Sequence, residues 1–310
     1  MSALREAAHE YLALRRALGY KLKQQGRMLL QFVDYLDERG ATVITTELAL
    51  EWARQPSSAS HMWWHKRLAV VRGFARHLAG LDPRTEVPAS DLLPARIHRA
   101  VPYLYSDAEI ARLIEAAQAM ASPLKAATYA TLIGLLSVTG MRVGEAIGLD
   151  REDVDLESGW LLIRHAKNER SREVPLHPSA VQALQDYAHL RDELCPRALT
   201  ESFLVTTTGR RPDPRPIGRG FEALRCATGL SERRSPSGRL PRIHDLRHSF
   251  VLRTLVNWYR AGSDVEAELP LLSTFVGHVD PASSYWYFEG TPELLSLAAE
   301  RFERAWEELS

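Results

Sequence analysis

The sequence WLLIRHAKNERSREVPL, residues 160–176, contains two short runs rich in β-forming residues, 160–164 and 172–176, on either side of a polar turn. Two such runs with a polar turn between them predict an antiparallel hairpin. The segments around the hairpin carry apolar residues at helical spacing instead. Helices are expected at 107–120 and 123–139 before it, and at 178–193, 216–228, 245–261 and 291–308 after it. The sequence therefore predicts a mainly α-helical unit with a small antiparallel β-sheet.

A domain boundary is expected upstream of these elements. Residues 81–104 contain four prolines and no sustained periodicity, which is typical of a connector. Ser106 and Glu109 follow with the spacing of a capping box, which indicates a helix start. Residues 1–80 have apolar residues at helical spacing, interrupted by glycines. We therefore expect a helical domain at 1–88, a linker at 89–104 and a second domain at 105–310.

The composition is that of an ordinary globular protein, with 45% hydrophobic and 25% charged residues among 310. No apolar run approaches the roughly 18 residues needed to cross a membrane, and the first residues have no apolar signal core. The two cysteines, Cys195 and Cys226, are too few for a disulfide framework and lack the paired spacing of a zinc site. These features predict a cytoplasmic protein without a membrane segment.

The charge is balanced overall but uneven along the chain. The 39 basic and 39 acidic side chains cancel, yet residues 1–100 have an excess of five basic residues. Residues 201–250 contain ten arginines against five acidic residues. Local basic surfaces on a neutral protein favour a polyanionic partner held in a cleft, although solvated helix faces would give the same count.

Two motifs each contain an arginine that is suited to binding a phosphate. In TGMRVGE, residues 139–145, Arg142 lies at a predicted helix start, where backbone donors also favour an anion; a surface arginine at a helix cap is the alternative. In HDLRH, residues 244–248, His244 and Arg247 share a helix face. Such a pair can present a titratable group and a permanent bidentate cation to one phosphate.

Two further histidines and an aromatic run complete the set. His248 lies one turn beyond His244 and raises the alternative of a metal pair, but no carboxylate or cysteine cluster completes it. His278 is followed nine residues later by Tyr287, inside SYWYF at 284–288. An aromatic run of this kind is usually part of a core.

The order Arg, Lys, His-x-x-Arg, His, Tyr resembles the tyrosine recombinase (phage integrase) family, and the segments TGMRVGEAIGL, HDLRHSF and GH-to-Tyr carry the resemblance. The likeness covers nearly the whole chain. Residues 1–88, with ALGYK, look like the family's SAM-like core-binding domain, and 105–310 look like its α+β catalytic domain. The resemblance implies a C-shaped clamp around double-stranded DNA.

The resemblance also implies roles for the basic residues. Arg142 and Arg247 would bind the scissile phosphate, whose non-bridging oxygens planar guanidinium groups neutralise bidentately. Lys167, the only lysine in 126–310, would protonate the departing 5′ oxygen, although a solvated turn lysine is the alternative. Its turn lacks the glycines that flank this lysine in many relatives. Glu145 would orient a neighbouring catalytic group, with a helix-surface carboxylate as the alternative.

The remaining implied roles concern the nucleophile. Tyr287 would attack the phosphate, and because a free tyrosine has a pKa of about 10, it needs a base and a cationic pocket. His244 would assist proton transfer at this nucleophile. His278 would hydrogen-bond the phosphate or buttress the site, or lie buried and satisfied. Tyr285 is the rival nucleophile, but only Tyr287 has the family's nine-residue spacing from His278.

The predicted function is a site-specific DNA recombinase that acts through a 3′-phosphotyrosyl intermediate without a cofactor or metal. The alternatives are a non-catalytic DNA-binding protein that organises a synapse and a relaxing enzyme of the type IB topoisomerase kind. The predicted helix 291–308 is amphipathic, and in the family such a tail packs on a neighbouring subunit of a tetrameric synapse; packing on its own domain is the alternative. Sibling recombinases are further possible partners. Seven basic residues are candidates for DNA contacts: Lys21, Lys23, Arg27, Lys66, Arg67, Arg72 and Arg219.

Overall fold

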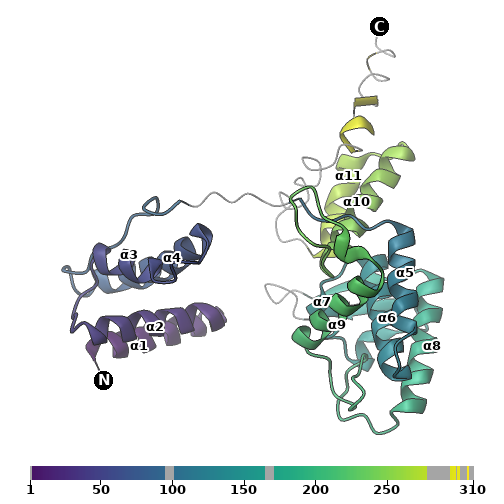
Figure 1. Ribbon diagram of the computed structural model, residues 1–310, viewed down its shortest axis with the longest axis horizontal. Helices are drawn as coiled ribbons and strands as arrows, with labels where there is room; N and C mark the ends of the chain where they lie inside the picture. The colour runs from purple at the N-terminus through teal and green to yellow at the C-terminus, as the bar shows by residue number, and fades with distance from the viewer. Residues whose placement is uncertain are drawn as a thin grey trace. The chain divides into compact units, whose positions relative to one another are not determined.

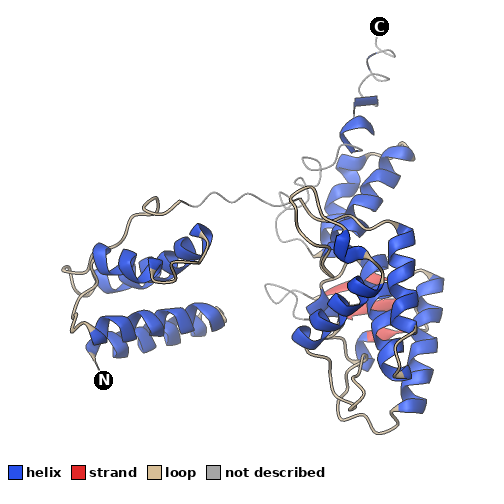
Figure 2. Ribbon diagram, viewed as in Figure 1, coloured by secondary structure: helices blue, strands red, loops and turns tan. Residues whose placement is uncertain are grey.

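The computed structural model describes residues 2–94, 101–164, 171–277, 294–297, 299–300 and 306. The chain divides into two compact units, Met1–Arg99 and Ala100–Ser310, whose elements are shown in Figures 1 and 2. The division falls within the stretch expected to be the linker. Within the described part of the chain, no helix is long and apolar enough to cross a membrane.

The first unit is built from helices α1 to α4, which confirms the prediction that the N-terminal part is helical. Three of them begin with a hydroxyl side chain, from Ser2, Thr45 and Ser60, that accepts a hydrogen bond from a backbone N–H of the first turn. The large side chains Phe32 and Trp52 are buried where the helices meet. The four helices are α1 (Ala3–Ala17), α2 (Lys23–Glu38), α3 (Thr46–Arg54) and α4 (His61–Ala79).

Part of the expected linker is held against this first unit. Arg72 on α4 donates from Nε to Pro88 O and from Nη2 to Ala89 O, both at 2.8 Å. Leu93 is 2% exposed and belongs to the same hydrophobic core. At the other end, Val101 N donates to Ser237 Oγ of the second unit at 2.7 Å. The ends of the 89–104 stretch therefore pack on the units they adjoin.

The second unit is mainly helical with one three-stranded antiparallel sheet of order β1-β2-β3. β2 (Trp160–Ile163) pairs with β3 (Arg172–Pro175), with Ile163 opposite Arg172, which confirms the predicted hairpin. β1 (Val154–Asp155) adds an unpredicted strand. The main helices are α5 (Asp107–Gln118), α6 (Pro123–Thr139), α7 (Val143–Ala146), α8 (Pro178–Leu194), α9 (Pro214–Ala227), α10 (Asp245–Arg260) and α11 (Val265–Val276). Two 3₁₀ turns, η1 (Arg151–Asp153) and η2 (Leu230–Glu232), complete the described elements.

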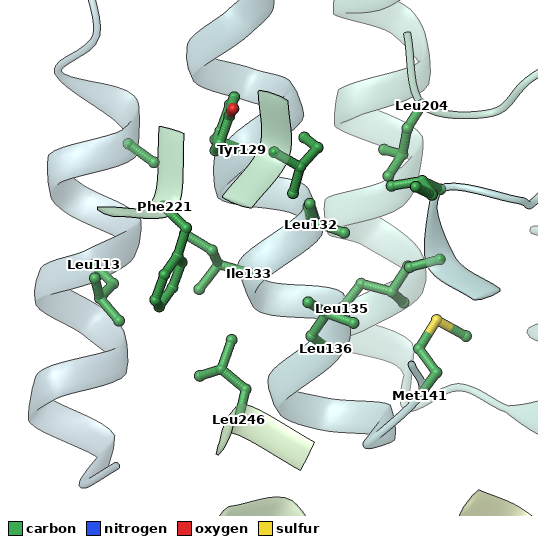
Figure 3. Close-up of a cluster of buried hydrophobic side chains, with 14 of the residues drawn as sticks. Leu113, Tyr129, Leu132, Ile133, Leu135, Leu136, Met141, Leu204, Phe221 and Leu246 are labelled. Carbon is green, nitrogen blue, oxygen red and sulfur yellow. The ribbon is translucent and has the colours of Figure 1, made fainter. Parts of the chain in front are cut away.

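Helix α6 is the centre of the second unit, packed against α5, α8 and α10. Figure 3 shows Phe221 of α9 inserted between Leu113 of α5 and Ile133 of α6, with Leu246 of α10 close by. The Phe221 side chain is 2% exposed and the three aliphatic side chains are fully buried. This packing fixes the C-terminal half of α6, which leads into the turn that contains Arg142.

The first helix of this unit is capped as predicted, and its last segment is partly described. Ser106 Oγ accepts from Glu109 N at 3.2 Å and Glu109 Oε2 accepts from Ser106 N at 3.0 Å, so the predicted capping box is confirmed. Of the predicted helix 291–308, residues 294–297, 299–300 and 306 are described, and all of them are helical. Leu294 is 1% exposed in a small core with α10 and α11, so this residue packs on its own unit.

Candidate active site

The turn between α6 and α7 presents Arg142. Gly140 ends α6 in the left-handed conformation, with φ +60°, and a Cβ there would lie 2.4 Å from Phe250 Cδ1. Arg142 follows as the N-cap residue of α7, and its own N–H donates to Glu145 Oε2 at 2.9 Å. Because Glu145 occupies this donor, the Arg142 N–H is not free to bind an anion. The positive charge at this helix start is that of the Arg142 guanidinium group.

Arg142 and Arg247 meet at the C-terminal end of α11. Arg247 lies on α10, is 3% exposed, and donates from Nη1 to Gly140 O at 2.7 Å and to Val276 O at 2.6 Å. Arg142 donates from Nη2 to Gly277 O at 2.9 Å. The structure therefore brings together two arginines that are far apart in the sequence, as the motifs predict.

His244 lies at the N-cap position of α10, one turn before Arg247. The His244 side chain is exposed at the surface, but desolvation by the protein around it lowers its pKa below the ordinary value, and the positive charge of Arg247 acts in the same direction. The ring is therefore neutral at neutral pH and able to accept a proton. Its ring meets that of His248 edge to face, with centroids 5.1 Å apart. Among the described residues, no group of three histidine, cysteine or acidic side chains is arranged to hold a metal ion.

Glu145 lies between two arginines, one of which the sequence did not predict. Its Oε1 accepts from Arg142 Nη1 at 2.6 Å, and its Oε2 accepts from Arg172 Nη2 at 2.7 Å. Burial acts to raise the pKa of Glu145, but hydrogen bonds from Arg172 and Arg142 outweigh it, so the pKa is lowered and the carboxylate is ionised. Arg172 opens β3 and also donates from Nε to Phe275 O at 2.9 Å.

The other expected catalytic residues, Lys167, His278 and Tyr287, lie outside the described residues, as does the rival Tyr285. Two described residues of the site are close to them in the sequence. Arg172 follows Lys167 by five positions in the sequence, and Gly277 immediately precedes His278.

The candidate DNA contacts separate into exposed and buried residues. Lys21, Lys23, Arg27 and Lys66 of the first unit are exposed, and so is Arg219 of the second. Arg67 and Arg72 are each only 8% exposed. The Arg67 guanidinium lies 3.6 Å from the centroid of the Trp52 ring and donates to Trp52 O at 2.8 Å, while Arg72 holds the backbone at residues 88–89. Their burial argues for a structural role and against contact with a phosphate.

Residues 104–292 match the model of the phage integrase family. The chain belongs to this family. A Sinorhizobium fredii protein named as the integrase/recombinase y4rB is 45% identical over 314 residues, which cover 99% of each chain. The family's enzymes are tyrosine recombinases, and this chain is accordingly a site-specific recombinase that cleaves and rejoins DNA.

Solved structures of recombinases share the fold of this chain. The Tn1549 transposon integrase in complex with transposon right end DNA is 18% identical, with a TM-score of 0.69 over 98% of this chain and 99% of that one. A lambda integrase tetramer bound to a Holliday junction is 19% identical, with a TM-score of 0.61 over 90% of this chain and 77% of that one. These likenesses agree with the mainly helical fold predicted around the hairpin.

Proposed function

We propose that this recombinase uses Tyr287 as its nucleophile and Arg142 and Arg247 as ligands of the scissile phosphate. The Tyr287 oxygen forms a bond to phosphorus, the bond from phosphorus to the 5′ oxygen breaks, and the product is a 3′-phosphotyrosyl enzyme with a free 5′-hydroxyl strand. Attack by the 5′-hydroxyl of a partner strand reverses these steps. The observation that best supports the proposal is the anchoring of both guanidinium groups on consecutive carbonyl oxygens, Val276 O and Gly277 O, directly before His278.

The proposed role of each residue follows from the charges that develop during the reaction. Negative charge grows on the non-bridging oxygens as phosphorus is attacked, and guanidinium groups fixed in advance stabilise it without reorganisation. A neutral His244 assists removal of the phenolic proton, and Lys167 supplies a proton to the departing 5′ oxygen. His278 hydrogen-bonds the phosphate. The phosphotyrosyl bond conserves the energy of the cleaved diester, so rejoining consumes no nucleotide.

A suicide-substrate assay tests this proposal. Nicked duplex DNA from the genomic flanks of the gene is incubated with the wild type, Tyr287→Phe and Tyr285→Phe, and adducts are separated on a denaturing gel. The expected result is a covalent adduct with the wild type and Tyr285→Phe that is absent with Tyr287→Phe. An adduct that survives Tyr287→Phe and disappears in Tyr285→Phe would make Tyr285 the nucleophile. DNA binding by the wild type without any adduct would favour the synapse-organising alternative.

The proposed partner is double-stranded DNA, bound by both units in the cytoplasm. The exposed side chains of Lys21, Lys23, Arg27 and Lys66 on one unit and Arg219 on the other support phosphate contacts. Because these contacts release counterions, DNA affinity should fall steeply as salt is raised. A flat salt dependence would contradict this mode of binding.

We also propose that the enzyme assembles on DNA as a homotetramer through its C-terminal segment. Leu295 and Trp306 of this segment are 55% and 66% exposed, which leaves apolar surface for a neighbouring copy. The tetrameric state of the related lambda integrase supports the same assembly. Analytical ultracentrifugation with and without DNA should detect tetramers only with DNA, and Leu295→Asp with Trp306→Asp should prevent them. Tetramers that persist in this double variant would contradict the proposed contact.

A further inference from the structure

Three arginines donate hydrogen bonds to three successive carbonyl groups at the end of α11. Arg172 Nε donates to Phe275 O at 2.9 Å, and Arg247 Nη1 donates to Val276 O at 2.6 Å. Arg142 Nη2 donates to Gly277 O at 2.9 Å. The last carbonyls of a helix lack intrahelical partners and carry partial negative charge, so they attract cations. Two of these arginines are the proposed phosphate ligands, and the third, Arg172, has no role in the reaction proposed above.

Arg172 also shares its carboxylate partner with Arg142. Glu145 bonds Arg142 through Oε1 and Arg172 through Oε2, and the side chains of Glu145 and Arg172 are each 9% exposed. The cluster therefore places two permanent cations around one anion in a poorly solvated environment, where such interactions are stronger than in water. Without Arg172, the full charge of Glu145 would act on Arg142 alone and compete with a phosphate for it.

The space beside α11 is shaped for a guanidinium group. Gly277 has φ +70°, and a Cβ there would lie 2.6 Å from Arg172 Nη1 and 2.8 Å from Arg172 Cζ. The guanidinium thus occupies the place that a side chain at 277 would need. A lysine at 172 would supply the charge, but its single ammonium group could not reproduce the fork that bonds Phe275 O and Glu145.

We propose that Arg172 is a positioning residue for DNA cleavage, which preserves the charge of Arg142 for the scissile phosphate by sharing Glu145. Through β3 and Phe275 O it also ties the hairpin that contains Lys167 to the helix end that precedes His278. Arg172 acts through its neighbours and does not itself touch the DNA. The inference rests on the proposed function, because it assumes that Arg142 binds the phosphate.

The test compares Arg172→Gln, Arg172→Lys, Glu145→Gln and the double variant Glu145→Gln/Arg172→Gln in the full chain. Single-turnover cleavage of the suicide substrate at saturating DNA gives the rate of the chemical step, and a gel-shift titration gives DNA affinity separately. Arg172→Gln should slow cleavage about 10- to 100-fold while DNA affinity changes by less than about threefold, because geometry at the phosphate is disturbed and other contacts remain. Arg172→Lys should recover only part of the rate.

The double variant distinguishes charge sharing from simple structural support. Removing the negative charge of Glu145 frees Arg142 again, so the double variant should cleave faster than Arg172→Gln. If Arg172 only holds the fold together, the second substitution should slow cleavage further, and that result would overturn the proposal. Thermal melting of each variant identifies any that fail to fold, and the rate comparison is then made at a temperature where all are folded.

Arg191→Gln is the matched control. Arg191 lies on α8, is 3% exposed, pairs with Asp192 and donates from Nη1 to Phe203 O at 2.9 Å. It is therefore also a buried arginine that links a carboxylate to a backbone carbonyl, and these two partners do not belong to the proposed site. Arg191→Gln should cleave at the wild-type rate. Equal rates for Arg172→Gln and Arg191→Gln would overturn the inference while leaving the proposed function intact. A wild type that forms no adduct would instead refute the proposed function, and this inference with it.

Discussion

Replacing Gly140 by alanine tests how the end of α6 holds Arg247, one of the two proposed phosphate ligands. Gly140 O accepts a hydrogen bond from Arg247 Nη1 at 2.7 Å. A Cβ on residue 140 would lie 2.4 Å from Phe250 Cδ1 and 3.0 Å from Phe250 Cγ. Phe250 stacks on Phe275, with ring centroids 5.7 Å apart, so its ring has little room to withdraw. The new methyl group must therefore displace either the Phe250 ring or the Gly140 carbonyl.

Two separate costs contribute to the expected effect. Alanine in the left-handed conformation costs about 1 kcal/mol more than glycine. Forcing one extra carbon into a packed site costs about 1–3 kcal/mol more. Gly140→Ala should therefore lower the free energy of unfolding of the second unit by about 2–4 kcal/mol. Because Gly140 O positions Arg247, cleavage should also slow by about a hundredfold, the effect of a misplacement near 1 Å.

Urea unfolding measures this loss, and hydrogen exchange in peptides from α6 and α10 serves as the probe that reports on the second unit alone. Gly229→Ala is the control, because Gly229 has φ +73° and nothing within 4 Å of its built Cβ. It should lose only the conformational cost of about 1 kcal/mol and keep the cleavage rate. Equal destabilisation by Gly140→Ala and Gly229→Ala would refute the argument from Phe250 packing.

Three further predictions follow from single groups. Because partial desolvation and the charge of Arg247 lower the pKa of His244, the stability that its neutral form gives is complete above pH of about 6.5 and is lost as pH falls through the lowered pKa. The cleavage rate should fall in the same acidic window, and a pH–rate midpoint at or above about 6.5 would contradict this. Lys66→Ala should reduce the slope of log DNA affinity against log salt concentration by about one, because one phosphate contact is lost. Arg72→Ala should leave this slope unchanged and lower the free energy of unfolding of the first unit, measured in urea, by about 2 kcal/mol. The reverse pattern would make Arg72 a phosphate contact. Lys167→Ala should slow cleavage with nearly unchanged DNA binding in gel shifts, and an equal loss of both would argue against its role as general acid.

Local sequence signals predicted most of the fold of the second unit. The hairpin and the capping box depend on residues within one short segment, and the predicted element boundaries there agree with the structure to within two residues. Helix α11 was missed because Pro270 lies inside it, and an internal proline removes a backbone hydrogen bond and normally argues against a helix. Helix α3, with nine residues, is too short for its periodicity to stand out.

The site was predictable only where its residues belong to a motif. Arg142, His244 and Arg247 stood out through their neighbours in the sequence, whereas Arg172 depends on partners 27 and 103 residues away, Glu145 and Phe275. No local pattern encodes such contacts. The same reasoning explains why Arg72 was predicted to bind DNA, because a helical charge pattern does not reveal a guanidinium bonded to backbone carbonyls 16 and 17 residues further on.

The C-terminal end of α11 connects the proposed phosphate ligands to the segment of the chain that contains the proposed nucleophile. The carbonyl groups of residues 275–277 hold three guanidinium groups, and the next residue in the chain is His278. Any movement of this helix end therefore moves the three guanidinium groups together with the residue that precedes His278. The Arg142 side chain is 30% exposed, against 9% for Arg172, so Arg142 is the more accessible of the two to a phosphate. This difference in exposure is what the proposed roles require, in which Arg142 binds the phosphate and Arg172 positions Arg142.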